Sequence, residues 1–197
     1  HASYRRQRQM CIRDSHQAFS EGADGLEIDV RLSKDKKPII FHDEDTSRLF
    51  KKSLEIKNTT FFELEALGNN ENRIPLLDEV LDFLPQNKEC FIEIKSDAKT
   101  VPFLDKLRIE KKNITFLSFD KNVVLALKKR FPNKLVFQSF HMLQIERYGI
   151  KKILEFYKNG NSDGLSIDIR GLSNKTIDKI LEKKIDLIIW TLNSMER

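Results

Sequence analysis

The chain has little of what marks disulfide-rich or membrane-spanning proteins. Its 197 residues include two cysteines, seven glycines and five prolines. Cys11 and Cys90 are too few for a disulfide framework, and no cysteine or histidine spacing is typical of a zinc site. No run of about 18 apolar residues occurs, so the sequence predicts no membrane-spanning helix. With no signal peptide visible either, we expect a cytoplasmic location.

The positive charge of the chain is spread along its length. The formal net charge is +5, and the fractions of hydrophobic (40%) and charged (33%) residues are those of an ordinary globular domain. The lysines are scattered and often follow Glu or Asp, as in residues 181–184, which is typical of a solvated surface. We therefore expect no nucleic-acid partner, whereas a diffuse positive field would attract an anionic small molecule.

From about Gly22 onward, short β-rich runs alternate with helical stretches, which indicates an α/β protein with a parallel sheet or barrel. The predicted strands are residues 25–30, 38–42, 90–95, 114–119, 135–140, 164–169 and 186–191. They are nearly continuous apolar runs, as expected where both faces of a strand are buried, and this favours a (β/α)8 TIM barrel over a sandwich. Such barrels usually need about 250 residues, so we expect this one to be incomplete.

The connections between the strands are of three kinds. Amphipathic runs predict helices over residues 76–84, 123–131 and 177–181. Residues 31–37 are too few for a crossover helix, so strands 25–30 and 38–42 are predicted to form a hairpin that brings Asp29 near His42. Residues 45–73 are polar with few periodic positions, and we expect an insertion or lid there.

Carboxylates occur inside apolar strands. Glu27 and Asp29 are two residues apart, so a strand points both to the same face. Alone, this pattern also fits two charges facing solvent. A second strand repeats it, because Glu93 and Lys95 share a face near the strand's carboxyl end, where barrels gather catalytic groups. Three carboxylates and a lysine suit a hard divalent cation and a phosphate.

His42 ends the predicted strand 38–42, directly after its apolar residues. For a single histidine, a hydrogen-bonded structural role is the simpler interpretation. Beside a metal site, however, imidazole is the natural proton donor near neutral pH, and we favour an acid–base role for His42.

At these residues the chain resembles the glycerophosphodiester phosphodiesterase family. Order and spacing agree from about Ala18 to Asn193. The matching stretches are residues 18–19, 22–30, 33–35, 42–43, 74–81, 93–95, 118–119 and 190–193.

The resemblance implies roles for six residues. The implied ligands of Mg²⁺ or Ca²⁺ are Glu27, Asp29 and Glu93. His42 would be the general acid on the departing alcohol, and Lys95 would contact the phosphate. Trp190 would pack on the glycerol part of the substrate, although a capping core aromatic fits its position equally well.

The implied activity is that of an enzyme, a metal-dependent phosphodiester hydrolase. It would act on small glycerophosphodiesters and release sn-glycerol 3-phosphate and an alcohol. Two alternatives stay open: a related barrel phospholipase that forms a cyclic phosphate, and a catalytically dead barrel that only binds phosphodiesters.

The chain departs from the family pattern at both ends. The family begins with a strand ending in His-Arg-Gly and soon carries Pro-Glu-Asn-Thr, and neither motif is found here. Residues 1–15 lack strand or helix periodicity, and we interpret them as non-native or disordered. Residues 16–197 are then a partial TIM-barrel domain lacking the first and last strands. We expect this chain by itself to be inactive, because a catalytic histidine and a phosphate-binding arginine are missing.

Overall fold

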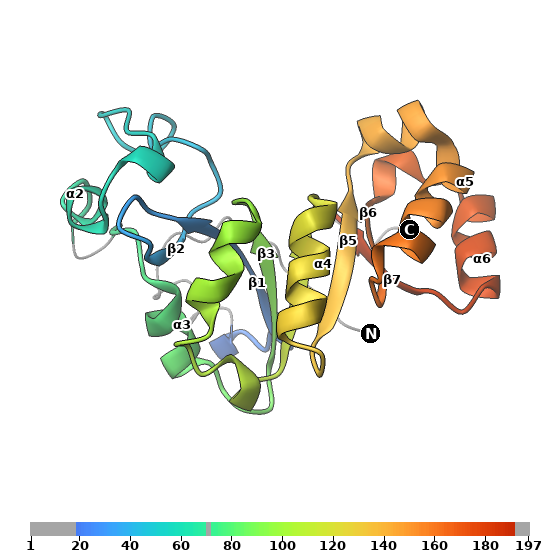
Figure 1. Ribbon diagram of the computed structural model, residues 1–197, viewed down its shortest axis with the longest axis horizontal. Coiled ribbons are helices and arrows are strands. Elements are labelled where there is room, and N and C mark those ends of the chain that lie inside the picture. Colours follow the sequence, from blue (N-terminus) through green and yellow to red (C-terminus); the bar gives the residue numbers. More distant parts are fainter. Residues whose placement is uncertain (1–18, 70–71, 192–197) are drawn as a thin grey trace. The chain divides into compact units, whose positions relative to one another are not determined.

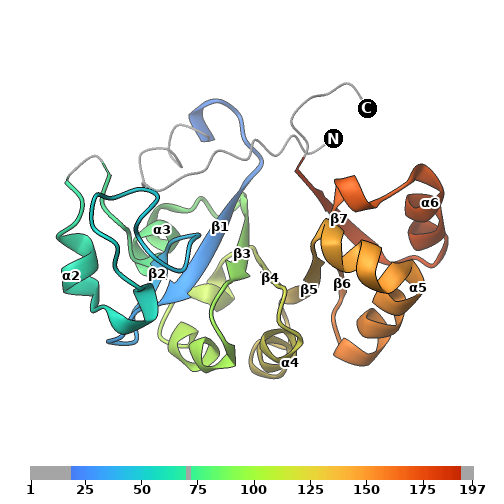
Figure 2. The same cartoon turned by 90° about the horizontal axis from the view of Figure 1, so that it is seen from above.

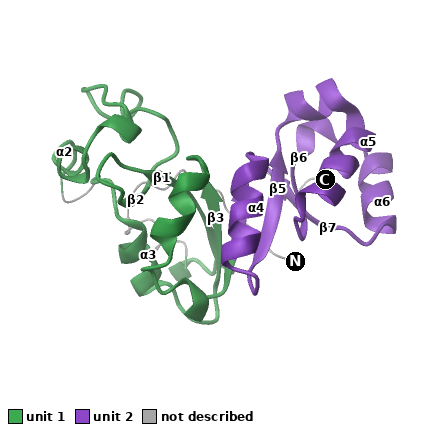
Figure 3. Cartoon of the chain, viewed as in Figure 1, with its two compact units in different colours: residues 1–114 green, residues 115–197 purple. Residues whose placement is uncertain are grey.

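The computed structural model describes residues 19–69 and 72–191 of the chain. The segment 1–15, interpreted as non-native or disordered, therefore lies outside the described residues, as does Asn193. The chain divides into two compact units, unit 1 over residues 1–114 and unit 2 over residues 115–197 (Figure 3).

Unit 1 contains the strands β1 (Gly25–Leu32), β2 (Pro38–Ile40) and β3 (Glu89–Ile94), in the order β2-β1-β3 (Figure 1). β1 runs antiparallel to β2 and parallel to β3. The predicted hairpin is thus confirmed. Its turn is closed by a hydrogen bond from Ser33 N to Lys37 O of 3.1 Å.

The two faces of β1 differ in character. Leu26, Ile28, Val30 and Leu32 are buried, and the residues between them are only half-buried. Those intervening residues are Glu27, Asp29 and Arg31. Because successive side chains of a strand point to opposite faces, β1 has one apolar face that belongs to the core and one charged face.

The segment 45–73 shares a hydrophobic cluster with β2 and the residues that flank it. It contains a 3₁₀ turn (Ile56–Asn58) and the short helix α2 (Phe61–Glu65). The buried cluster consists of Ile39, Phe41, Ile56, Phe61, Leu64 and Ile74. Thr46 is also buried, with its hydroxyl donating to Lys52 O at 2.6 Å. The segment is therefore a packed part of unit 1, and its role as a lid stays a prediction.

Further helical elements of unit 1 precede and follow β3 in the sequence. They are α3 (Leu77–Phe83) and the 3₁₀ segments Ala98–Leu104 and Ile109–Lys111. The amide of Leu76 donates to Glu79 Oε2 at 2.8 Å and so caps the start of α3.

Unit 2 consists of parallel strands joined by helices. Its strands are β4 (Ile114–Ser118), β5 (Leu135–Phe140), β6 (Gly164–Asp168) and β7 (Asp186–Trp190), in sequence order. The connections contain α4 (Lys121–Arg130), α5 (Met142–Gly160), a 3₁₀ turn (Ile169–Gly171) and α6 (Asn174–Glu182). α5 is interrupted at Gly149, whose φ of 71° suits a residue without Cβ.

Helices α5 and α6 lie together on one side of β6 and β7 (Figure 2). The core they share with the strands consists of Phe140, Ile145, Ile153, Leu165, Ile167, Ile180 and Ile185. Ser166 and Asp168 alternate with Leu165 and Ile167 along β6, so these polar residues occupy the opposite face of the strand.

All seven predicted strands are present, each within two residues of its predicted bounds. The helices predicted over residues 76–84, 123–131 and 177–181 correspond to α3, α4 and α6. Cys90 is a buried free thiol on β3.

The close approach of Gly164 to neighbouring chain segments gives a stability prediction. A Cβ on Gly164 would lie 2.5 Å from Asp186 O and 2.6 Å from the Phe137 ring. Gly164→Ala should therefore lower the free energy of unfolding by about 1–3 kcal/mol in urea titrations followed by circular dichroism. The matched control is Gly160→Ala at the end of α5, where the nearest atom lies 4.0 Å away. This change should be neutral or stabilising, and equal losses in the two variants would contradict the packing described.

Candidate active site

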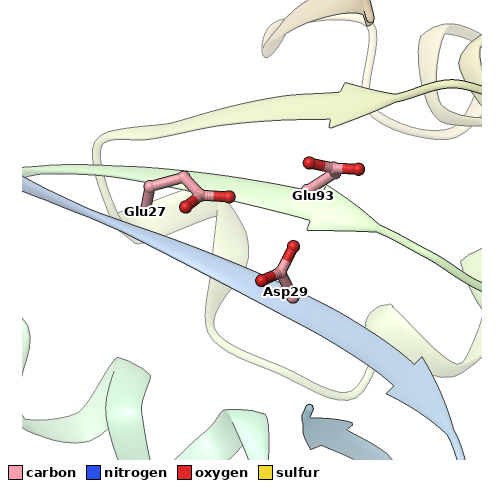
Figure 4. A group of neighbouring side chains, drawn as sticks. All are labelled: Glu27, Asp29 and Glu93. Atoms are coloured by element: carbon pink, nitrogen blue, oxygen red, sulfur yellow. The ribbon is translucent and has the colours of Figure 1, made fainter. Parts of the chain in front are cut away.

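Three carboxylates converge on the charged face of unit 1. Glu27 and Asp29 project from β1 and Glu93 from β3 (Figure 4). Each offers an oxygen atom, and these atoms lie within 4.8 Å of one another. The parallel register sets Asp29 opposite Glu93, with Glu27 two residues earlier on the same face. The structure thus brings together the three residues predicted to bind a cation.

Lys95 lies against the same carboxylates. Its Nζ is 2.7 Å from Glu93 Oε1 and 3.3 Å from Asp29 Oδ1. Burial alone would lower the pKa of Lys95, but the negative charges of Glu93 and Asp29 outweigh it, so the pKa lies above its ordinary value. Lys95 is therefore a permanent positive charge beside the cluster at neutral pH.

The donor set fits a hard divalent cation. It consists of carboxylate oxygens alone, which Mg²⁺ and Ca²⁺ prefer, and Glu93 is only 6% exposed. One ammonium against three carboxylates leaves an excess of negative charge in a partly desolvated place. A bound cation would remove this excess.

The backbone of His42 is held beside β1. Phe41 N donates to Asp29 O at 2.9 Å, and Arg31 Nε donates to His42 O at 3.0 Å. The imidazole is half exposed, and its Nδ1 lies 2.7 Å from Asp43 Oδ1. If Nδ1 carries the proton of this hydrogen bond, Nε2 is left to exchange a proton with a substrate.

Asp43 keeps its negative charge. Burial would raise the pKa of Asp43, but hydrogen bonds from Arg48 and His42 outweigh burial and hold the pKa below its usual value. Asp43 is consequently ionised at neutral pH and can orient the imidazole of His42. The sequence analysis noted Asp43 within a matching stretch but gave it no role.

Arg31 is a residue of this site that the sequence analysis missed. It follows Glu27 and Asp29 on the charged face of β1. Burial lowers the pKa of Arg31, and the charges of Glu44 and Asp29 oppose that effect. A guanidinium remains protonated throughout the pH range of proteins. The same two-residue period that identified the carboxylates, continued by one step, would have identified Arg31.

Trp190 ends β7 in unit 2. Its Nε1 donates to Ser166 Oγ at 3.0 Å, and its ring packs edge-on against Phe119, with 6.0 Å between centroids. The indole is half-buried. These contacts fix its orientation, and its predicted role in packing on glycerol stays a prediction.

A second polar cluster surrounds Asp168 in unit 2, and the sequence analysis missed it too. The Asp168 side chain is fully buried, and Arg170 binds both of its oxygens, at 3.0 Å from Nε and 2.6 Å from Nη2. His141 Nε2 lies 3.6 Å from Asp168 Oδ2. The hydrogen bond from Arg170 lowers the pKa of Asp168. The pair Ser166 and Asp168 has the same spacing as Glu27 and Asp29, which was the available signal.

Charged groups at the carboxyl ends of parallel strands, joined by helices, define an α/β enzyme of the (β/α)-barrel type. Comparison with known proteins narrows this class. The chain belongs to the glycerophosphoryl diester phosphodiesterase family, whose model matches residues 12–162. The predicted family is thereby confirmed.

Solved structures share the fold. The crystal structure of a glycerophosphodiester phosphodiesterase from Thermotoga maritima is 29% identical, with a TM-score of 0.79 over 96% of this chain and 82% of that chain. A phosphodiesterase from Oleispira antarctica, solved with its product sn-glycerol-3-phosphate, is 22% identical, with a TM-score of 0.79 over 93% of this chain and 78% of that chain. The predicted α/β barrel class is confirmed by this similarity.

A curated relative matches part of the chain. The glycerophosphodiester phosphodiesterase of Caldanaerobacter subterraneus is 30% identical over an alignment of 118 residues that covers 55% of this chain and 48% of the relative. Separately, within residues 19–69 and 72–191 no helix is both long and apolar enough to cross a membrane.

The Asp168–Arg170 pair predicts a pH-dependent stability. Because the folded pKa of Asp168 lies below the unfolded value of about 3.9, its stabilisation is present above that value and is lost as pH falls through the folded pKa. Asp168→Asn should lower the free energy of unfolding at pH 7 by about 1–3 kcal/mol. The difference in the free energy of unfolding between Asp168→Asn and the wild type, called the gap below, should narrow below pH 4. Urea titrations between pH 3 and 8 measure this gap.

Asp178→Asn, at an exposed position on α6, is the control and should change stability by less than about 0.5 kcal/mol at every pH. A gap for Asp168→Asn that stays constant down to pH 3 would contradict the assigned pKa direction.

Proposed function

We propose that this chain carries the active site of a metal-dependent glycerophosphodiester phosphodiesterase, which releases sn-glycerol 3-phosphate and an alcohol. The observation that carries the proposal is the convergence of Glu27, Asp29 and Glu93 around Lys95 on one face of β1 and β3. The family to which the chain belongs supports the choice of substrate.

Different residues would bind the cation and the phosphoryl group of the phosphodiester. Glu27, Asp29 and Glu93 would hold Mg²⁺ or Ca²⁺. A cation held there would supply Lewis-acid stabilisation of the charge that develops on a phosphoryl oxygen. Lys95 supplies a second positive charge to the phosphoryl group once its ammonium no longer has to neutralise Asp29 and Glu93.

His42 is the proposed general acid. With a proton on both ring nitrogens, the imidazole would donate a hydrogen bond from Nδ1 to Asp43 and deliver the Nε2 proton to the oxygen of the departing alcohol. Arg48 binds Asp43 from its other side and keeps the carboxylate in place. Trp190 is proposed to pack its indole on the glycerol part of the substrate. The location, predicted to be cytoplasmic, remains part of the hypothesis.

Two substitutions separate metal binding from proton transfer. Glu93→Gln keeps the shape of the side chain but removes one charge, so cation affinity should fall and excess cation should restore part of the activity. His42→Ala should leave cation affinity unchanged and lower turnover by about 10²- to 10⁴-fold, the usual contribution of acid–base catalysis. Both substitutions are made in the version of the chain extended at both ends from its genomic sequence, because the chain by itself is expected to be inactive. Calorimetric titration with Mg²⁺ and Ca²⁺ measures affinity, and hydrolysis of glycerophosphocholine measures turnover.

Glu155→Gln, at an exposed position on α5, is the control for the loss of one carboxylate. Equal losses of cation affinity in Glu93→Gln and His42→Ala would contradict the division of roles. Release of a cyclic phosphate, detected by phosphorus NMR, would instead indicate the phospholipase chemistry.

The expected inactivity of this chain by itself also remains a hypothesis. The assay should compare the chain with a version extended at both ends from its genomic sequence. Turnover by the extended version alone is the expected result. Equal turnover by both would overturn the expectation of inactivity while supporting the proposed function.

A further inference from the structure

The register between β1 and β3 places Arg31 next to Lys95. The last printed pair of the β1–β3 register is Val30 opposite Ile94, and Lys95 N donates to Val30 O at 2.9 Å. Continuing the register by one residue sets Arg31 beside Lys95. On the charged face of the two strands, a pair of carboxylates, Asp29 and Glu93, is therefore followed toward the carboxyl ends by a pair of cations.

The guanidinium of Arg31 is anchored at one nitrogen only. Its Nε donates to His42 O at 3.0 Å. Within the part of the chain that the structure describes, its two Nη groups have no hydrogen-bond acceptor and no carboxylate at ion-pair distance. The charges of Asp29, Asp43, Glu44 and Glu93 all act on it, yet none of them pairs with it directly.

Three other arginines of the chain differ from Arg31 in this respect. Arg48, Arg73 and Arg170 each bind a carboxylate, at distances of 2.5–2.6 Å. Arg31 is half-buried and so has lost part of its hydration without gaining such a partner. Leaving guanidinium donors partly desolvated is costly, and a ligand that accepts two parallel N–H bonds would remove the cost.

We propose that Arg31 is a phosphate-binding residue of this site, donating from its Nη groups to the phosphoryl oxygens alongside Lys95. The assignment rests on the proposed function for the identity of the ligand. A phosphoryl group matches the planar fork of a guanidinium, which a lysine cannot replace geometrically. The order along the strands places the phosphate next to the cation site, with Arg31 and Lys95 as its positive contacts.

The hydrogen bond from Arg31 Nε to His42 O also connects Arg31 to the proposed general acid. The guanidinium that contacts the phosphate is the same group that holds the backbone of the proposed general acid. Binding of the phosphate and placement of His42 are therefore linked through one side chain.

The test measures binding rather than turnover. sn-Glycerol 3-phosphate and inorganic phosphate are titrated into the chain by calorimetry, with and without saturating Ca²⁺. Arg31→Met should weaken binding of both ligands by about 10- to 100-fold, the usual value of charge-assisted hydrogen bonds. It should leave Ca²⁺ affinity unchanged or increased, because a positive charge near Asp29 and Glu93 is removed. The shared loss identifies the phosphoryl group as the contact, whereas a loss for the ester alone would overturn a phosphate contact.

Two further variants keep the result interpretable. Arg108→Met removes an exposed arginine of the same unit, with its Nη1 3.5 Å from Asp82, and should leave phosphate affinity unchanged. Arg31→Lys keeps the charge but not the fork and should show an intermediate loss, even if Arg31→Met fails to fold. Unchanged phosphate affinity in both Arg31 variants would overturn the proposal, as would parallel losses of phosphate and Ca²⁺ affinity, which indicate a structural role.

The outcomes also separate this proposal from the proposed function. If phosphate binding depends on Arg31 but the extended protein hydrolyses no glycerophosphodiester, the function is wrong and the assignment of Arg31 stands. If hydrolysis occurs and the Arg31 substitutions leave phosphate affinity unchanged, the proposed function stands and the assignment of Arg31 is wrong.

Discussion

The repulsion among Glu27, Asp29 and Glu93 is the constraint on which the rest of the site depends. Parallel pairing of β1 and β3 holds these carboxylates within 4.8 Å of one another, and no side-chain rotation within the strands can move them to the apolar face. Like charges this close repel one another, and positive charge placed between them lowers that repulsion. Lys95 supplies one such charge, and a divalent cation would supply the rest.

The hairpin of β1 and β2 serves the same site. Because the connection is short, the end of β2 returns beside the middle of β1, where Phe41 N bonds to Asp29 O. His42 follows immediately and is tied again through the guanidinium of Arg31. The packed segment 45–73 supports this arrangement from the other side of β2, since Phe41 belongs to its hydrophobic cluster. Rigid support of this kind keeps a proton donor in place.

The sequence was sufficient for the strands because they are nearly continuous apolar runs, and for the carboxylate cluster because its members follow the two-residue period of a strand. It did not reveal the core of segment 45–73, since Phe61 and Leu64 span only one helical turn and Ile56 lies in no periodic run. Arg31 was not identified because, in the sequence, a cation near two carboxylates resembles an ordinary surface ion pair. Only the structure shows that Arg31 has no direct carboxylate partner among the described residues. Asp168 was not identified because the spacing alone predicts neither its burial nor its pairing with Arg170.

The central claim is that Glu27, Asp29 and Glu93 together bind one divalent cation. A crystal structure with Ca²⁺, using the anomalous signal of calcium, tests it most directly. The account predicts one ion bonded to an oxygen of each carboxylate at about 2.3–2.6 Å, with Lys95 Nζ displaced from between Asp29 and Glu93. A crystal at saturating Ca²⁺ in which Lys95 still bridges the two carboxylates and no ion is bound there would contradict it.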